Sequence, residues 1–307
     1  MCQLFRGIVI ALKFFYFVVE SIVLFLTPAF LMKKKNIKGQ NVLITGTGSG
    51  VGRELAKEFA KYGCNVIMWD VNTAGNEETL RQLRDMGFSA KGYTVDISIP
   101  QRIYKAADLV KQECGKVDIV INNAGIANGK GLFDCTDEMI ERSFAINAKS
   151  HFHIAKCFLP GMLETNNGHI VTVASIAGKV ASAGLIDYTA SKHGVVGFHD
   201  SLTAEIVQTG KTGVMTTLVC PYYINTNMFD GNGVKTKIPS ILAVLEQDYV
   251  ARKILESVLI NREYIAMPRI IHFLIAGGGL LPRKAAALLA DSIELVQSTD
   301  RFNRSQN

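Results

Sequence analysis

Three residue types that can move a proton lie close together in the second half of the sequence. Tyr188 and Lys192 are four residues apart, so a helix would place both side chains on one face. Ser175 precedes Tyr188 by thirteen residues and follows a β-branched run. A free tyrosine has a pKa of about 10, which nearby positive charge lowers. The spacing predicts a tyrosine that exchanges a proton with a substrate hydroxyl, a lysine that lowers its pKa, and a serine that hydrogen-bonds the substrate oxygen.

The same tyrosine–lysine spacing occurs a second time, at Tyr249 and Lys253. This second pair comes after a long stretch of little periodicity, and no serine-bearing strand end precedes it. We therefore expect Tyr249 to be a packing residue at the start of a helix. The context favours Tyr188 and Lys192 as the reactive pair.

A glycine-rich segment near the N-terminus has the features of a phosphate-binding turn. Residues 45–52 read TGTGSGVG, directly after a β-branched run and directly before an amphipathic stretch. Glycines in such a turn let backbone N–H groups approach a pyrophosphate at the start of a helix, where the helix dipole favours anions. The predicted contacts of this segment with a dinucleotide are Gly46, Ser49, Gly50, Val51 and Gly52.

A single acid indicates which dinucleotide is bound. Asp70 ends the second β-branched run, eighteen residues after Gly52. A carboxylate there can accept hydrogen bonds from both ribose hydroxyls of NAD, and it would repel the 2′-phosphate of NADP. No Arg or Lys neighbours Asp70 in sequence. The predicted cofactor is therefore NAD.

The elements that position these residues alternate between strands and helices. This alternation predicts an α/β, Rossmann-type doubly wound parallel sheet in a single domain, with ligands beyond the C-terminal ends of the strands. Expected strands are 42–45, 66–70, 92–96, 119–122, 169–173 and 215–220, and expected helices lie near 51–62, 75–86, 100–114, 137–163 and 188–208.

The ordered set of motifs resembles the short-chain dehydrogenase/reductase family over about residues 39–260. The glycine segment fits its T-G-x-x-x-G-x-G pattern, and Tyr188 to Lys192 supply its Y-x-x-x-K. Asp96 matches the adenine-side acid, with Ile97 beside it, and residues 122–125 read NNAG. The further cofactor contacts that the resemblance implies are Asp96, Ile97, Asn123, Ala124, Gly125, Tyr188, Lys192, Pro221 and Thr226.

The resemblance also implies roles that spacing alone does not give. Lys192 would hold the nicotinamide ribose, and Asn147 would hold a water that relays the proton to solvent. A homodimer is implied through the helices near 137–163 and 188–208. Tyr222 departs from the family pattern, because many members have Gly after the proline that corresponds to Pro221. This departure makes the turn bulkier and more apolar.

The charge and the apolar residues are concentrated at the N-terminus. The 307 residues are 48% hydrophobic with a formal charge of +6, and the mean hydropathy is +0.20. Residues 1–38 alone carry +5, from Arg6, Lys13, Lys33, Lys34, Lys35 and Lys38 against Glu20. Because the rest of the chain is nearly neutral and has no basic stripe, no nucleic-acid partner is expected.

Residues 8–32 are almost wholly apolar, which predicts an N-terminal hydrophobic anchor helix with a basic flank after it. Lys33 to Lys35 favour a cytosolic location for the domain that begins after them. A spanning helix, a monolayer-embedded helix or hairpin, and an interfacial helix all remain open, because Lys13 and Glu20 share one helix face. A cleaved signal peptide is disfavoured, since no A-x-A-like site precedes the lysines.

The remaining composition excludes several classes of site. The six cysteines are scattered without metal-ligand spacing, so we expect no metal site and free thiols in a reducing compartment.

The expected organisation is an anchor and basic flank at 1–38, an NAD-binding dehydrogenase domain at 39–268, and an apolar segment with a tail at 269–307. Residues 270–281 would be a core element or a pocket wall that touches lipid, and residues 222–245 a functional loop such as a lid.

Several segments resemble a membrane-associated branch of the family whose members act on retinol and hydroxysteroids, among them residues 170–175, 195–199 and 216–222. The resulting hypothesis is an NAD-dependent oxidoreductase that interconverts a lipophilic alcohol and its aldehyde or ketone. It would work at an endoplasmic reticulum membrane or lipid-droplet surface, with the catalytic domain facing the cytosol. The alternative is a scaffold protein of these surfaces that binds cofactor with incidental turnover.

Overall fold

The computed structural model describes residues 2–226, 228 and 242–278, and residues 281, 282, 284, 285 and 288. The chain divides into two compact units, Met1–Asn36 and Ile37–Asn307. In the first unit, α1 spans Cys2–Leu26 and a short 3₁₀ helix spans Ala29–Leu31. A helix is therefore present where the anchor is predicted.

Apolar side chains of α1 are exposed, among them Phe14 and Phe15 at 70% and 68%. Tyr16 donates a hydrogen bond to Glu20 across one helical turn, at 3.1 Å. Within the described ranges, the structure contains no helix with both the length and the apolar character needed to cross a membrane. The anchoring of α1 in a membrane stays a prediction.

The described residues of the second unit form a seven-stranded sheet in which every pair is parallel, with the order β3-β2-β1-β4-β5-β6-β7. This order reverses direction at β1, as in a Rossmann-type doubly wound sheet, and it confirms the predicted fold class. The strands are β1 Asn41–Thr45, β2 Asn65–Asp70, β3 Ala90–Thr94, β4 Ile119–Asn122, β5 Gly168–Val173, β6 Val214–Pro221 and β7 Tyr264–Met267.

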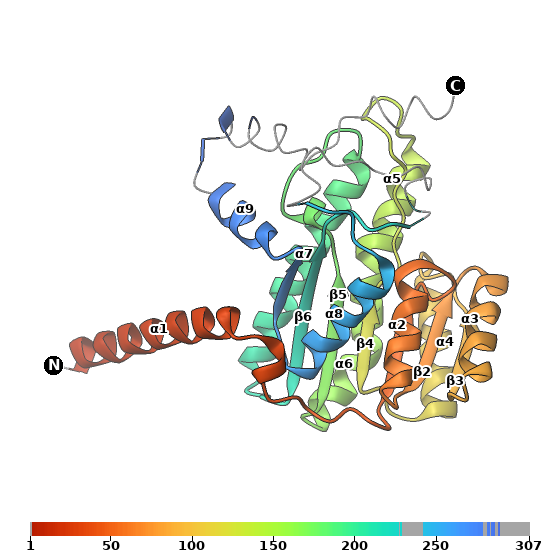
Figure 1. Cartoon of the computed structure of the whole chain (residues 1–307), viewed down its shortest axis with the longest axis horizontal. Helices are drawn as coiled ribbons and strands as arrows, with labels where there is room; N and C mark the ends of the chain where they lie inside the picture. The colour runs from red at the N-terminus through yellow and green to blue at the C-terminus, as the bar shows by residue number, and fades with distance from the viewer. Residues whose placement is uncertain are drawn as a thin grey trace. The chain divides into compact units, whose positions relative to one another are not determined.

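Two groups of helices cover the sheet (Figure 1). On one face α2 contacts both α3 and α8, and on the other α6 contacts both α4 and α7. The helices of this unit are α2 Gly50–Lys61, α3 Thr73–Asp85, α4 Pro100–Cys114, α5 Asp137–Phe144, α6 Ser150–Glu164, α7 Ile186–Gln208, α8 Gln247–Leu259 and α9 Ile270–Gly278.

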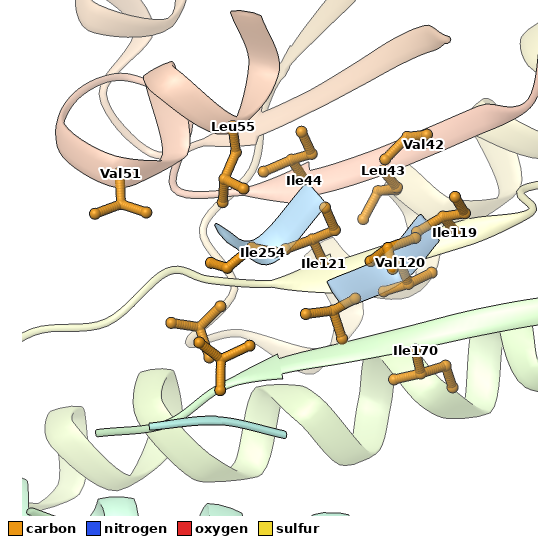
Figure 2. Packing of buried hydrophobic residues seen from close by; sticks show 14 of the residues in the cluster. Val42, Leu43, Ile44, Val51, Leu55, Ile119, Val120, Ile121, Ile170 and Ile254 are labelled. Carbon is orange, nitrogen blue, oxygen red and sulfur yellow. The ribbon is translucent and has the colours of Figure 1, made fainter. Parts of the chain in front are cut away.

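The core lies between the central strands and these helices. Ile44 on β1 and Ile121 on β4 are fully buried, and Leu55 on α2 and Ile254 on α8 are fully buried as well. Figure 2 shows these side chains in one packed cluster with Ile170 of β5. Strands buried on both faces need continuous apolar runs, which is what the sequence of β1 and β4 provides. This packing fixes the strand ends that carry the polar residues.

The structure differs from the sequence-based expectation at three places. The third strand ends at Thr94, two residues before Asp96, and β7 was not predicted. The single helix expected over 137–163 consists of α5, a π-helical turn at Ala145–Lys149, and α6. A π turn inside a helix is frequent at functional sites. Most of the predicted lid, residues 227 and 229–241, lies outside the described residues, as does most of the tail beyond Gly278.

Candidate active site

A cavity of about 550 Å³ opens at the C-terminal ends of the strands. Its walls come from the glycine segment, from the ends of β2, β4, β5 and β6, and from the start of α7. The predicted site residues that line it are Gly46, Ser49, Gly50, Val51, Gly52, Asp70, Asp96, Ile97, Asn123, Ala124, Gly125, Ser175, Tyr188, Lys192, Pro221 and Thr226. Of the predicted set, Asn147 alone is absent from the lining.

The glycine segment can form only without side chains at certain positions. Gly46 has a φ of +77°, and a Cβ there would lie 2.9 Å from the Cα of Ala124. At Gly52 a Cβ would come within 1.8 Å of the Gly46 carbonyl oxygen. Helix α2 begins at Gly50, so its free N–H groups start at the cavity wall. This close approach of backbone to a cavity at a helix start fits a pyrophosphate.

The carboxylate of Asp70 faces the glycine segment. Its two oxygens accept hydrogen bonds from the backbone amides of Gly48 and Asn72, each at 2.7 Å. Each carboxylate oxygen has a second lone pair, so Asp70 keeps acceptor capacity toward the cavity that it lines. Among the residues that the structure describes, no cation forms an ion pair with Asp70 within 4.0 Å. The geometry fits an adenosine ribose with free hydroxyls.

Two residues that brace the site were missed by the sequence reasoning. The Thr45 hydroxyl accepts hydrogen bonds from the backbone amides of Asn123 and Ala124, both at 3.0 Å, and so ties the end of β1 to the end of β4. Arg53 donates to the Gly48 carbonyl and, at 2.9 Å, to the Thr79 hydroxyl. For the Thr45 contacts, the only local signal in the sequence was the position of this threonine at the start of the glycine segment. No local pattern indicated the contacts of Arg53.

Ser175 and Tyr188 meet at the other end of the cavity. A hydrogen bond joins the two side chains, and the backbone amide of Ala177 donates to the Ser175 hydroxyl at 3.1 Å. Tyr188 is 7% exposed, in the first turn of α7. The hydroxyls of Ser175 and Tyr188 are thus held together, and a substrate oxygen could accept hydrogen bonds from both in place of the bond between them.

Lys192 lies one turn further along α7, and it is 3% exposed. Its ammonium donates a hydrogen bond to the Val173 carbonyl at 3.0 Å and lies 5.6 Å from the centroid of the Tyr188 ring. The carbonyl at the end of β5 therefore orients the ammonium beside the tyrosine, on the face that the four-residue spacing predicts.

Asn147 is placed behind the cavity wall, in the π-helical turn, and is fully buried. Its carbonyl oxygen accepts from the Ile126 amide at 2.8 Å, while its amide nitrogen donates to the Ile126 carbonyl at 2.9 Å and to the Ser191 hydroxyl at 3.0 Å. The side chain thus fastens the segment after β4 to α7. Because both amide hydrogens are used, the side chain does not offer a donor to a water.

Burial dominates the electrostatics of the two reactive residues. It raises the pKa of Tyr188 to about 12, although the hydrogen bond with Ser175 acts in the opposite direction. It lowers the pKa of Lys192 to about 8. The lowering of the tyrosine pKa by Lys192 and by the charge of an oxidised nicotinamide is expected for the cofactor-bound enzyme and stays a prediction.

Other predicted features lie away from the cavity. Tyr249 is near the start of α8, partly buried against the core, which confirms its predicted packing role. None of the described residues of α9 lines the cavity, and Ile271 is buried in the core. This placement supports the core alternative for that segment. Among the described side chains, no cluster of three His, Cys, Asp or Glu residues could hold a metal ion.

This combination of a doubly wound sheet, a glycine turn and a serine–tyrosine–lysine set defines a dinucleotide-dependent oxidoreductase. Residues 40–236 match the short chain dehydrogenase family. The chain belongs to that family and is a short-chain alcohol dehydrogenase. It is 42% identical to epidermal retinol dehydrogenase 2 of Mus musculus over 88% of the chain and 87% of that protein. It is 38% identical to retinol dehydrogenase 10 of Homo sapiens over 84% and 83%. These relatives confirm the retinol dehydrogenase branch.

Solved structures show the same fold with both forms of the cofactor. A short chain dehydrogenase/reductase from Burkholderia phymatum, in complex with NAD, is 27% identical with a TM-score of 0.72, over 79% of this chain and 93% of that one. A metagenomic short-chain oxidoreductase in complex with NADP is 25% identical with a TM-score of 0.63, over 75% and 96%. The cofactor is therefore a nicotinamide dinucleotide.

Proposed function

We propose that this protein is an NAD-dependent dehydrogenase that interconverts a lipophilic, retinol-like alcohol and its aldehyde or ketone. The observation that carries the proposal is a single cavity with Ser175, Tyr188 and Lys192 at one end and Asp70 at the other. The first three residues suit proton exchange with a hydroxyl or carbonyl, and Asp70 suits an unphosphorylated ribose. The names of the relatives supply the substrate class.

Tyr188 exchanges the proton in either direction. In reduction it is the general acid, and its high pKa keeps it protonated at neutral pH. In oxidation it is the general base and must first lose its proton. The bound oxidised cofactor supplies hydride acceptance and a positive charge, and that charge together with Lys192 favours the phenolate.

Ser175, Lys192 and Asn147 orient the substrate and the cofactor and hold the elements of the site together. Ser175 hydrogen-bonds the substrate oxygen beside Tyr188. Lys192, fixed by the Val173 carbonyl, reaches the nicotinamide ribose, and Asn147 holds the segment after β4 in place against α7. A water that relays the proton to solvent would bind to backbone groups of the π-helical turn, because the amide group of the Asn147 side chain already hydrogen-bonds within the protein.

The preference for NAD over NADP rests on Asp70. A 2′-phosphate beside this carboxylate would meet like charge, and no described cation forms an ion pair with Asp70 to offset it. The glycine segment, Asp96, Ile97, Asn123, Pro221 and Thr226 complete the proposed cofactor site.

We place the enzyme at the endoplasmic reticulum membrane or a lipid-droplet surface, with its catalytic domain toward the cytosol. The exposed apolar side chains of α1 and the basic run Lys33 to Lys35 support this placement. A lipophilic alcohol would be concentrated in the same phase. A homodimer through the helical regions 137–163 and 188–208 belongs to the proposal as well.

The decisive experiment is turnover by the full chain reconstituted in phospholipid vesicles. We expect oxidation of all-trans-retinol with NAD at a kcat/KM at least about tenfold above that with NADP, since each 1.4 kcal/mol of discrimination is a factor of ten. Equal or better turnover with NADP would contradict the role of Asp70. An absence of turnover with any lipophilic alcohol, in protein that binds NAD, would contradict the proposed function.

A further inference from the structure

Two adjacent tyrosines form an aromatic corner beside the reactive residues. Tyr222 and Tyr223 come directly after Pro221 at the end of β6, are 3% and 9% exposed, and both line the cavity. Their ring centroids are 5.1 Å apart and their planes meet at 89°. One ring therefore presents its face at a right angle to the other. Neither ring has a role in the proton exchange or in cofactor binding described above.

The corner is fixed by the backbone on both sides. The Tyr222 amide donates to the Met267 carbonyl at 2.8 Å, and the Tyr223 carbonyl accepts from the Leu245 amide at 2.8 Å. The Asn225 amide donates to the Leu245 carbonyl at the same distance. Held in this way between β7 and residue 245, the two rings form a pre-formed wall, so little ordering is left for a ligand to impose.

The corner also lies close to the proton-transfer residue. Tyr188, Tyr222 and Tyr223 all line the same cavity, and the phenols of Tyr222 and Tyr188 add to the effect of burial in raising the pKa of Tyr223. Apolar residues from the start of α7 and from the segment after β6, Leu185 and Ile224, line the same cavity. The cavity that offers Tyr188 to a substrate oxygen therefore also offers aromatic and apolar surface to the carbons of that substrate.

We propose that the Tyr222–Tyr223 corner selects an alcohol whose hydroxyl-bearing carbon continues into a flat, conjugated chain. This inference rests on the proposed function and deepens it. A planar unsaturated chain can lie on the face of one ring while the edge of the other contacts its side, the offset and perpendicular contacts that π systems prefer. A saturated chain is thicker and loses rotational freedom when it is ordered against the same wall.

The test compares two alcohols that differ only in saturation, all-trans-retinol and perhydroretinol, with the full chain in vesicles and NAD. The variants Tyr222→Leu and Tyr223→Leu remove the rings and keep apolar bulk. Tyr222→Phe and Tyr223→Phe keep the rings and serve as matched controls. Two quantities are measured for each protein: the ratio of kcat/KM for the two alcohols, and the equilibrium binding of retinol to the NAD-bound protein.

We expect the wild type to favour retinol and each leucine variant to lose about three- to tenfold of that ratio, the range that aromatic contacts give. The phenylalanine variants should stay within about twofold of the wild type. An unchanged ratio in leucine variants that still turn over both alcohols would overturn the inference and leave the proposed function standing. Weaker retinol binding in the leucine variants, with no turnover of either alcohol by the wild type, would support the aromatic corner and overturn the proposed function. Leucine variants whose kcat/KM ratio and retinol binding both match those of the wild type would overturn the proposed role of the aromatic corner.

Discussion

The backbone amide of Gly48 donates a hydrogen bond of 2.7 Å to the carboxylate of Asp70. This bond joins the turn that approaches the phosphates to the acid that faces the ribose, so one loop conformation serves both. A Cβ at Gly48 would lie 3.0 Å from that carboxyl group. Cofactor choice and loop shape are therefore linked in this protein.

Asp70→Asn should lower kcat/KM with NAD by about ten- to a hundredfold, because charged acceptors form the stronger hydrogen bonds with ribose hydroxyls. It should also raise kcat/KM with NADP, since the repelling charge is gone. Steady-state rates with both cofactors measure the change. Asp85→Asn, on the outer surface of α3, is the matched control and should alter neither rate. An unchanged cofactor ratio in Asp70→Asn would contradict the assignment.

Tyr188→Phe should reduce turnover by about 10²- to 10⁴-fold while NAD binding persists, because the variant removes only the proton-exchanging hydroxyl. Tyr249→Phe changes the other tyrosine of the repeated spacing and should keep full activity, since Tyr249 packs against the core on α8. Single-turnover rates and NAD titrations distinguish the two effects. Residual activity within tenfold of wild type in Tyr188→Phe would be incompatible with the mechanism.

The pH dependence should differ between the two directions. Oxidation needs deprotonated Tyr188, whose pKa burial raises to about 12, and it needs the Lys192 ammonium that favours the phenolate, so its rate should rise with pH up to about 8 and then level off. Reduction needs the protonated tyrosine and the Lys192 ammonium, so it should be level below pH 8 and fall above it, where the lysine loses its proton. Initial rates in both directions test this pattern. An oxidation rate that falls between pH 7 and 9, while the fold persists, would refute it.

Lys192→Met should abolish turnover and yet stabilise the fold at pH 7. Burial lowers the lysine pKa from 10.5 to about 8, which means that the folded state disfavours the charged form. Removal of this cost should raise the free energy of unfolding by about 1–2 kcal/mol, after the lost hydrogen bond to Val173 is subtracted. The wild type, in turn, should gain stability as the pH rises from 8 toward 10.5, because the unfolded lysine binds more protons there.

Denaturant unfolding of both proteins provides the measurement. The matched control is Lys253→Met, at the surface position of the repeated spacing, which should change the free energy of unfolding by less than about 0.5 kcal/mol. A Lys192→Met protein less stable than the wild type at pH 7 would show that the ammonium supports the fold instead.

Gly52→Ala should prevent cofactor binding, because the added Cβ would overlap the Gly46 carbonyl oxygen at 1.8 Å. The glycine segment would have to move away from the cavity that it lines. Calorimetric titration with NAD should show no binding, while circular dichroism reports an intact sheet. Gly131→Ala meets nothing within 4 Å and should bind NAD normally. Normal NAD affinity in Gly52→Ala would contradict the proposed fit of loop and pyrophosphate.

Much of this site could be predicted from the sequence because its parts lie directly after buried strands. The strand 119–122 was predicted at the bounds that Ile119–Asn122 has, since four apolar or amide residues form a clear run. Strand β3 was displaced by two residues, because Ala90–Thr94 is an edge strand with mostly exposed side chains and lacks that run. Strand β7 is only four residues long and was missed.

Long-range contacts were the part that could not be predicted. The hydrogen bonds of Asn147 depend on a π-helical turn that no local pattern signals. The pKa of Tyr188 depends on how completely its side chain is buried, and the sequence does not show that burial. The right angle between Tyr222 and Tyr223 likewise requires β7 and residue 245 to be in place.

The strand order places the two ends of the cavity on opposite sides of β1. The ribose-facing carboxylate lies at the end of β2, whereas the proton-exchanging set and the aromatic corner come after β5 and β6. Among the described residues, Asp70 and the Tyr222–Tyr223 corner belong to separate segments of the chain. Relatives could therefore differ in the segments after β5 and β6, and so act on different alcohols, while they keep the same electron carrier. Substrate choice and cofactor choice are separately adjustable in this architecture.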